Sequence, residues 1–165
     1  MKTGQVTPQQ ITGWLNIQQV NRVLEGMLEH SLQKETDLSW PEFELLFRLR
    51  VAGDHPLQMG EIAAQLINSP SGATRIADRL EEDGLISRET PADNRRVVEV
   101  RLTAKGRETV ARADGVFRGV LRERFVDPLS DAELDMLKRL LRKLLEKNGA
   151  WNEARCSPGA PLASS

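Results

Sequence analysis

Residues 69–106 read SPSGATRIADRLEEDGLISRETPADNRRVVEVRLTAKG, and the spacing of apolar residues changes half-way along this stretch. In its first half, alanine, isoleucine and leucine recur at spacings of three and four residues, which is the period of an amphipathic helix. Ser69 can cap this helix, Pro70 suits its first position because a missing N–H is harmless there, and Gly84 can end it. We therefore predict a helix over about residues 70–83.

The second half of the stretch has the period of a β-strand. Over residues 97–102, Val98, Val100 and Leu102 alternate with Val97, Glu99 and Arg101, which predicts a strand. The segment LISRET at 85–90 is its natural partner, and the intervening PADN at 91–94 contains the residue types that reverse a chain. The sequence therefore predicts a β-hairpin directly after the helix.

A second short helix is expected just before the first. Met59, Ile62, Ala63 and Leu66 fall at the spacings of one helical face, and the pattern stops near residues 67–68. Two short helices around a tight turn, followed by a hairpin, are typical of a winged helix-turn-helix. The expected fold is thus mainly α, with a small β-hairpin wing.

In a winged helix-turn-helix the second helix can enter the major groove of DNA. We expect Ala73, Ile76, Ala77 and Leu80 to face inward. The residues expected to face outward are Ser71, Thr74, Arg75, Asp78 and Glu82.

Small polar residues at the start of this helix suit a close approach to DNA. Ser71 and Gly72 let the backbone come near, and Ser69, Ser71 and Thr74 can donate to phosphate oxygens. Arg75 is long enough to reach a guanine edge or a phosphate. We predict that these residues contact DNA, although Ser69 is first of all a helix cap.

The tip of the hairpin carries DNRR at 93–96. A guanidinium there would lie over the minor groove, where the negative potential of DNA is concentrated. Arg95 and Arg96 are therefore candidate contacts, and Asp93 is expected to orient one of them by an ion pair. Single surface arginines are often only solvated charges, and Arg79 and Arg88 are expected to form salt bridges around the module instead.

Long amphipathic helices flank this module. We predict them over about residues 8–33 and 103–148, the latter divided at VDPLSD near residue 126, and a further helix begins at the capping pair Ser39 and Glu42. The outer helices have more apolar surface than one winged module can cover, which favours a dimer. Residues 149–165 have the composition of a flexible tail.

Residues 56–106 strongly resemble the MarR family of bacterial transcriptional regulators. The likeness rests on DRLEEDG at the end of the predicted recognition helix, DNRR in the wing and LTAKG after it. The wing is one residue longer than the family pattern, so that either Arg95 or Arg96 fills the position of the wing arginine.

The resemblance implies a single domain over residues 1–148, with its winged part at about 39–103, and a homodimer formed by the outer helices. Such a dimer would place two recognition helices ~34 Å apart on a pseudo-palindromic operator in double-stranded DNA. It also implies a repressor, or less commonly an activator, that releases DNA when a small and often aromatic molecule enters a cleft. Trp14, Trp40 and Phe47 are candidate effector contacts, with ordinary core packing as the alternative.

The composition argues against several other classes of protein. The chain has 165 residues, a formal net charge of −1, one cysteine and two histidines, which gives no basis for a disulfide or a metal site. We find no catalytic constellation and no need for a cofactor, and we expect neither an enzyme nor a membrane protein but a cytoplasmic one. The main alternative is a winged module that binds protein rather than DNA, which would not need cations in its wing.

Overall fold

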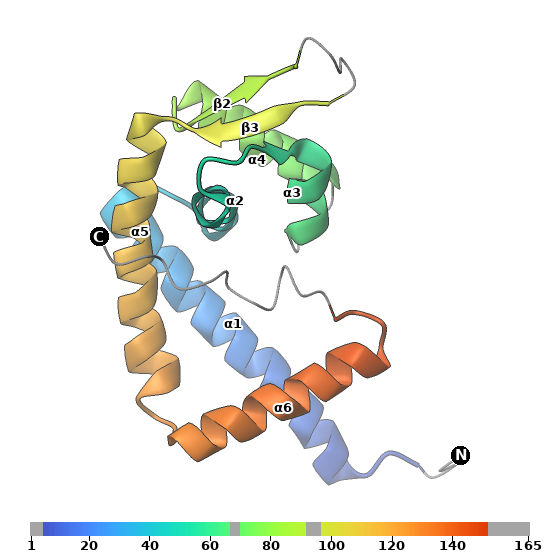
Figure 1. Ribbon diagram of the computed structural model, residues 1–165. Helices are drawn as coiled ribbons and strands as arrows, with labels where there is room; N and C mark the ends of the chain where they lie inside the picture. Colours follow the sequence, from blue (N-terminus) through green and yellow to red (C-terminus); the bar gives the residue numbers. More distant parts are fainter. Residues whose placement is uncertain (1–4, 67–69, 92–96, 152–165) are drawn as a thin grey trace.

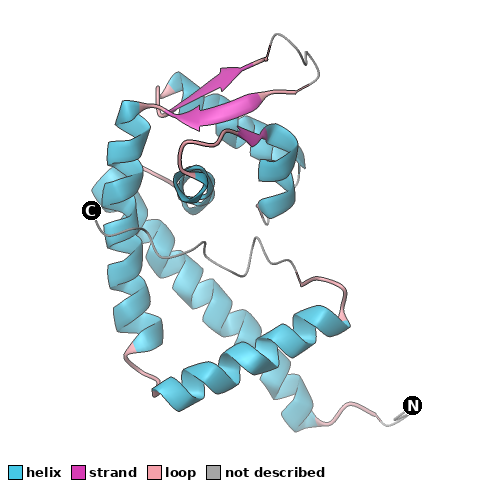
Figure 2. Ribbon diagram, viewed as in Figure 1, coloured by secondary structure: helices cyan, strands magenta, loops and turns pink. Residues whose placement is uncertain are grey.

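The computed structural model describes residues 5–66, 70–91 and 97–151. Within these ranges the chain is mainly helical, with a small antiparallel sheet at one end (Figures 1 and 2). The elements in chain order are α1 (Pro8–Thr36), α2 (Trp40–Ala52), β1 (Leu57–Gln58), α3 (Met59–Gln65), α4 (Pro70–Glu82), β2 (Ile86–Glu89), β3 (Glu99–Leu102), α5 (Ala104–Leu121), the π-helical turn η1 (Arg122–Val126) and α6 (Asp131–Lys147).

The winged module consists of α2, α3, α4 and the sheet, and it lies at one end of α5 (Figure 1). Helix α3 packs against α4, and β2 pairs antiparallel with β3, as the sequence predicts. The sheet also has a third strand that the sequence did not reveal, because β1 places Leu57 opposite Val100 and the order is β1-β3-β2. A strand of two residues is too short to show an alternating pattern.

One apolar core joins the winged module to the upper ends of the long helices. It is centred on residues of α2, such as Phe43 and Leu46, which have no more than 2% of their surface exposed. Leu80 of α4, Val100 of β3 and Val110 of α5 are fully buried against them. The core therefore fixes the position of α4 and the wing relative to α5.

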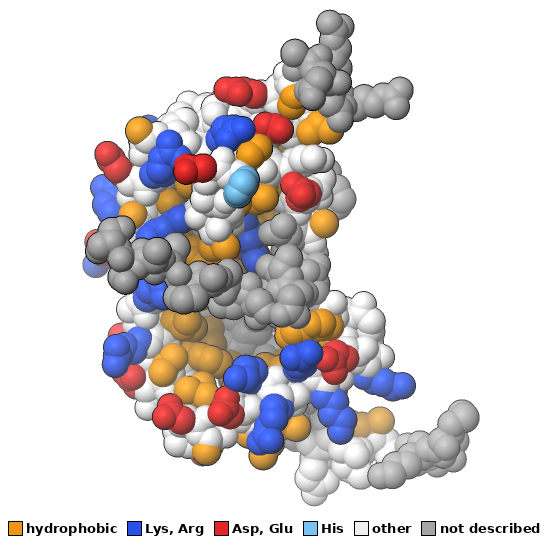
Figure 3. Space-filling model, viewed as in Figure 1, with side chains coloured by type: hydrophobic (Ala, Val, Ile, Leu, Met, Phe, Trp, Pro, Cys, Tyr) orange, Lys and Arg blue, Asp and Glu red, His pale blue; other side chains and the backbone are white. Residues whose placement is uncertain are grey.

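Most of α1 and all of α6 lie outside this core. In α1 only Leu28 and Leu32, near its C-terminal end, are buried, and α6 has no buried residue at all. Hydrophobic side chains accordingly gather on the surface of the half of the molecule that contains α6 (Figure 3). Exposed large apolar residues on α1 and α6 are Ile11, Trp14, Leu15, Ile17, Val20, Val23, Met27, Met136, Leu140, Leu141 and Leu144.

Two helix boundaries differ from the sequence-based expectation. Helix α1 begins at Pro8 as predicted, where Thr7 and Gln10 form a capping box, and it ends at Thr36, beyond the predicted end near residue 33. The predicted helix that ends near residue 126 is α-helical only to Leu121 and then widens into η1, where Asp127 N–H donates to the Arg122 carbonyl at 2.8 Å. Apolar periodicity does not distinguish these two kinds of helical turn. None of the described helices is both long and apolar enough to cross a membrane.

Candidate nucleic-acid interface

Helix α4 has one buried face and one open face. Ala73, Ala77 and Leu80 are fully buried, as predicted, whereas Thr74 and Arg75 are exposed. Methyl groups at the two alanine positions let α4 lie close to the core, so its backbone is held firmly while its other side faces outward. The structure thus presents the first half of α4 to a partner.

Arg75 differs from the other arginines of the winged module. Over residues 70–91 and 97–102, Arg79, Arg88 and Arg101 each form an ion pair with a carboxylate. Within the part of the chain that the structure describes, Arg75 has no such partner. Its charge therefore remains available to a negatively charged ligand.

Arg88 ties the wing to α4. From strand β2 its guanidinium reaches Asp78 Oδ1 at 2.6 Å, and its Nε donates to Glu81 Oε2 at 2.8 Å. The backbone N–H of Arg88 also donates to Glu81 Oε1. This hydrogen bonding lowers the pKa of Glu81 and raises that of Arg88. The salt bridge expected for Arg88 is therefore confirmed. One of its partners is Asp78, which was expected on the outer face of α4.

A second arginine ties α4 to the start of α2. Arg79 Nε lies 3.0 Å from Glu42 Oε1, while the other oxygen of this buried carboxylate accepts hydrogen bonds from the backbone N–H and hydroxyl of Ser39. The capping pair predicted for α2 is therefore present, and it also holds α4. This confirms the salt bridge expected for Arg79.

The C-terminal end of α4 and the start of α5 meet at a contact that we call the α4–α5 joint, formed by residues 83–85 and 103–106. Thr103 Oγ1 donates to the Gly84 carbonyl at 2.7 Å and caps α5 by accepting from Gly106 N–H. Lys105 Nζ donates to the Asp83 carbonyl at 2.7 Å. The TAKG part of LTAKG therefore serves helix packing, and the Lys105 side chain binds the protein itself.

Several of the predicted DNA contacts lie outside the described residues, namely Ser69, Asp93, Arg95 and Arg96. Ser71, Gly72, Thr74 and Arg75 all belong to the first turns of α4. Strands β2 and β3 lead into and out of the segment that contains DNRR, so the predicted wing residues connect two strands of the sheet.

The candidate effector residues do not form one group. Trp40 and Phe47 of α2 pack with Phe43 and with Phe117 of α5, and the ring centroids of the contacting pairs lie 5.3–6.4 Å apart. Trp14 lies outside this cluster, in the N-terminal half of α1, and is 60% exposed. The structure thus brings together two of the three residues and adds two phenylalanines.

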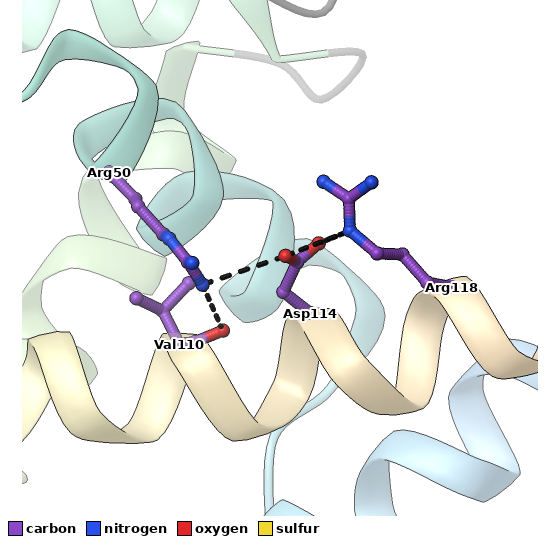
Figure 4. Close-up of polar contacts among 4 residues, drawn as sticks. All are labelled: Arg50, Val110, Asp114 and Arg118. Atoms are coloured by element: carbon purple, nitrogen blue, oxygen red, sulfur yellow. Dashed lines mark hydrogen bonds and ion pairs between the residues drawn. The ribbon is translucent and has the colours of Figure 1, made fainter. Parts of the chain in front are cut away.

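A buried carboxylate that the sequence analysis missed connects α2 with α5 (Figure 4). Asp114 is 5% exposed, its Oδ2 lies 3.6 Å from Arg50 NH1, and both its oxygens accept from Arg118 Nε. Arg50 also donates to the Val110 carbonyl at 3.4 Å. The sequence did contain a signal for this site, because Asp114 is an acidic residue on the apolar face of the helix that became α5.

Comparison with known proteins matches residues 38–98 to the MarR family. The chain is 34% identical to the transcriptional repressor MprA of Escherichia coli over 105 residues, which cover 64% of this chain and 59% of MprA. The crystal structure of AbsC, a MarR family transcriptional regulator from Streptomyces coelicolor, superposes with a TM-score of 0.82 at 26% identity, covering 90% of this chain and all of AbsC.

Residues 38–98 belong to the MarR family. The MarR-type fold extends beyond the matched segment, since Sco3205 of Streptomyces coelicolor, solved in complex with DNA, has a TM-score of 0.80 at 23% identity over 87% of this chain and 93% of Sco3205. The matched segment contains α4, β2 and all the predicted DNA contacts.

Proposed function

We propose that this MarR-family protein is a homodimeric transcriptional repressor that binds double-stranded DNA through α4 and the wing. The observation that carries the proposal is the open face of α4, where Arg75 has no ionic partner among the described residues while the neighbouring arginines are used in ion pairs. A free guanidinium on the exposed side of a firmly packed helix is suited to a base edge or a phosphate.

The wing would complete the interface. The ion pairs of Arg88 hold β2 at a fixed angle to α4, so that both elements approach DNA as one surface. We propose that Ser69, Ser71, Gly72 and Thr74 support the entry of α4 into the major groove. Asp93, Arg95 and Arg96 would act at the wing, in the adjacent minor groove.

The proposed dimer follows from the exposed faces of α1 and α6. A 17-residue amphipathic helix without a single buried residue would expose its leucines to water in a monomer. A second copy of the chain can cover them, and a palindromic operator requires the same two-fold symmetry. The repressor would act in the cytoplasm, where its operator is found.

We further propose that a small molecule, such as an aromatic compound, releases the repressor from DNA. The aromatic cluster of Trp40 and Phe47 lies where α2 of the winged module meets α5. Trp14 would contribute only if the dimer brought a second α1 near this cluster.

Electrophoretic mobility shifts with the DNA upstream of the protein's own gene test the proposal. Affinity should fall steeply as salt rises, because cations on the protein displace counterions from phosphates. Changing Arg95 and Arg96 together to alanine should weaken binding to every duplex. Unchanged affinity of this double variant would remove the wing from the interface, and no binding by the wild type at low salt would favour a winged module that binds protein.

A further inference from the structure

Asp78 lies on the open face of α4, in line with residues that we expect to contact DNA. It follows Thr74 and Arg75 at the spacings of one helical face, so the three side chains project from the same side of the helix. The Asp78 side chain is 50% exposed, whereas Ala77 beside it is fully buried. Entry of α4 into the major groove would therefore bring a carboxylate to the base edges as well as the Arg75 guanidinium.

A carboxylate close to DNA is repelled by the phosphates unless a cation neutralises it, and Arg88 of the adjacent strand β2 is such a cation (Figure 1). Asp78 Oδ1 lies 2.6 Å from Arg88 Nη1, and the Arg88 side chain is only 24% exposed. Arg88 is held in turn by Glu81, which accepts from its Nε and from its backbone N–H. The Asp78 carboxylate is therefore oriented before DNA arrives, and it loses little conformational freedom on binding.

The protein uses only one oxygen of this carboxylate. Oδ1 is paired with Arg88, whereas Oδ2 forms no hydrogen bond and no ion pair with any residue that the structure describes. An ionised carboxylate can only accept hydrogen bonds. Oδ2 is therefore an oriented acceptor on the open face of α4, and a partner for it must be a donor.

We propose that Asp78 selects a cytosine in the operator by accepting a hydrogen bond from the exocyclic amino group of that base. Cytosine alone presents a donor to the major groove without an acceptor beside it, because adenine has N7 next to its amino group, and guanine and thymine present acceptors. The lone pairs of those three bases oppose a carboxylate. The inference rests on the proposed function, since it names a base that the same interface would select.

Asp78 would contribute selectivity rather than affinity. Asp78, Glu81 and Arg88 combine two carboxylates with one guanidinium, which leaves a net charge of −1 and weakens the attraction of α4 for phosphates of any sequence. Arg75 supplies positive charge on the same face, because it has no ionic partner among the described residues. The hydrogen bond to cytosine would offset the repulsion only at the correct operator, which is how unfavourable charges create specificity.

Selection of duplexes from a randomised library by the full-length protein, followed by sequencing, tests the assignment. The wild type should enrich a cytosine at one position in each half-site. Asp78→Asn should replace this preference by thymine or guanine, because the amide oxygen remains at Arg88 and the amide N–H then faces a base acceptor. Asp78→Ala should remove the preference without creating another.

Glu82→Gln is the matched control. Glu82 is the last residue of α4, is exposed, and has no ion pair among the described residues, so its substitution removes one negative charge beyond the part of a recognition helix that reaches base edges. It should leave every base preference unchanged. Competition binding gives the size of the effect: replacing the cytosine should weaken wild-type binding about tenfold and should leave Asp78→Ala binding unchanged.

The failure of this assignment and the failure of the proposed function are distinguishable. If the wild type enriches no sequence, the DNA-binding function is rejected, and the role of Asp78 with it. If the wild type enriches a sequence and Asp78→Asn enriches the same one, only the role of Asp78 is overturned.

The folding of the two Asp78 variants is checked by circular dichroism. Both should fold, because Glu81 still holds Arg88 and thereby β2. If neither folds, or if both lose affinity equally for all duplexes, Asp78 only supports Arg88 and the proposal is overturned.

Discussion

Gly106 lies where the start of α5 meets the backbone that follows α4, with no space for a side chain between them. A Cβ atom at this position would overlap the carbonyl oxygen of Leu85, which is itself engaged by Thr103 N–H at 3.1 Å. The glycine of LTAKG is therefore required by close approach of two backbones, and its φ angle is not in the left-handed region. The close approach thus explains physically why glycine is needed at position 106, which the sequence showed only as part of a motif.

Gly106→Ala should destabilise the fold by about 2–4 kcal/mol, because the α4–α5 joint must open to admit the methyl group. Urea denaturation followed by circular dichroism measures this change. Gly115→Ala on the same helix is the control, since an added Cβ there meets nothing within 4 Å. The control should be neutral or slightly stabilising, as alanine favours a helix over glycine. Equal stability of the two variants would disprove the close approach.

Arg75→Ala should cost about 1–3 kcal/mol of DNA affinity and relax the preference for one operator position, if Arg75 reads a base. Competition binding with operators altered at single positions measures both effects. Arg112→Ala, an exposed change on α5, is the matched control. A loss that is the same for all sequences would instead assign Arg75 to a phosphate.

At the scale of elements, apolar periodicity predicted α1 to α6 in the right order, because each long helix has a repeating apolar face. The capping pair of Ser39 and Glu42 located the start of α2. The short strand β1 and the turn η1 were missed, since neither has a period of its own. The polar links through Arg79, Arg88 and Asp114 join elements that are distant in sequence, and only Arg79 and Arg88 were expected to form salt bridges.

The link between α4 and β2 should be sensitive to acid. Hydrogen bonding from Arg88 lowers the pKa of Glu81 below its ordinary value of 4.5, so the folded state favours the ionised carboxylate. Its stabilising effect is therefore present above the ordinary pKa and is lost as the pH falls through the lower folded value. We expect the stability difference between wild type and Glu81→Gln to shrink between about pH 5 and pH 3.

The size of this effect should be less than about 1 kcal/mol, because the pair is partly open to solvent and is screened by it. Thermal unfolding at a series of pH values measures it. Glu108→Gln on α5 is the control, as its carboxylate has no ion pair among the described residues. Parallel pH profiles for wild type and Glu81→Gln would refute the role of the Arg88 link.

For the whole molecule, the fold class could be predicted from sequence because the helical spacing, the strand alternation and the turn residues all indicate a winged helix-turn-helix. The candidate interface was predicted only in part. The buried and exposed faces of α4 agree with the expectation from sequence. The partners of Asp78 and Lys105 were found only in the structure, because such pairings depend on tertiary packing. Trp14, Trp40 and Phe47 were chosen as candidate effector contacts because they are aromatic. Residue type alone could not show that Trp14 lies apart from the other two.

Leu141→Asp tests the proposed dimer, because this leucine lies on the exposed apolar face of α6. A charge in an apolar interface should give monomers or insoluble protein. Light scattering coupled to size exclusion measures the mass. Arg139→Asp places the same carboxylate on the polar side of α6 and should leave the dimer intact. A dimeric Leu141→Asp protein would show that α6 does not form the interface.

If the protein binds DNA as proposed, the central position of β3 affects how an operator is read. The strand is bonded to β2 on one side and to β1 on the other, and the first residue of α3, Met59, donates its N–H to the Val98 carbonyl. A wing that shifts to follow a narrower or wider groove therefore moves the helix pair with it. Altered bases under the wing and under the helix should then be non-additive in their energetic effects, so that a simple position-by-position scoring of binding sites would misrank the operators of this protein.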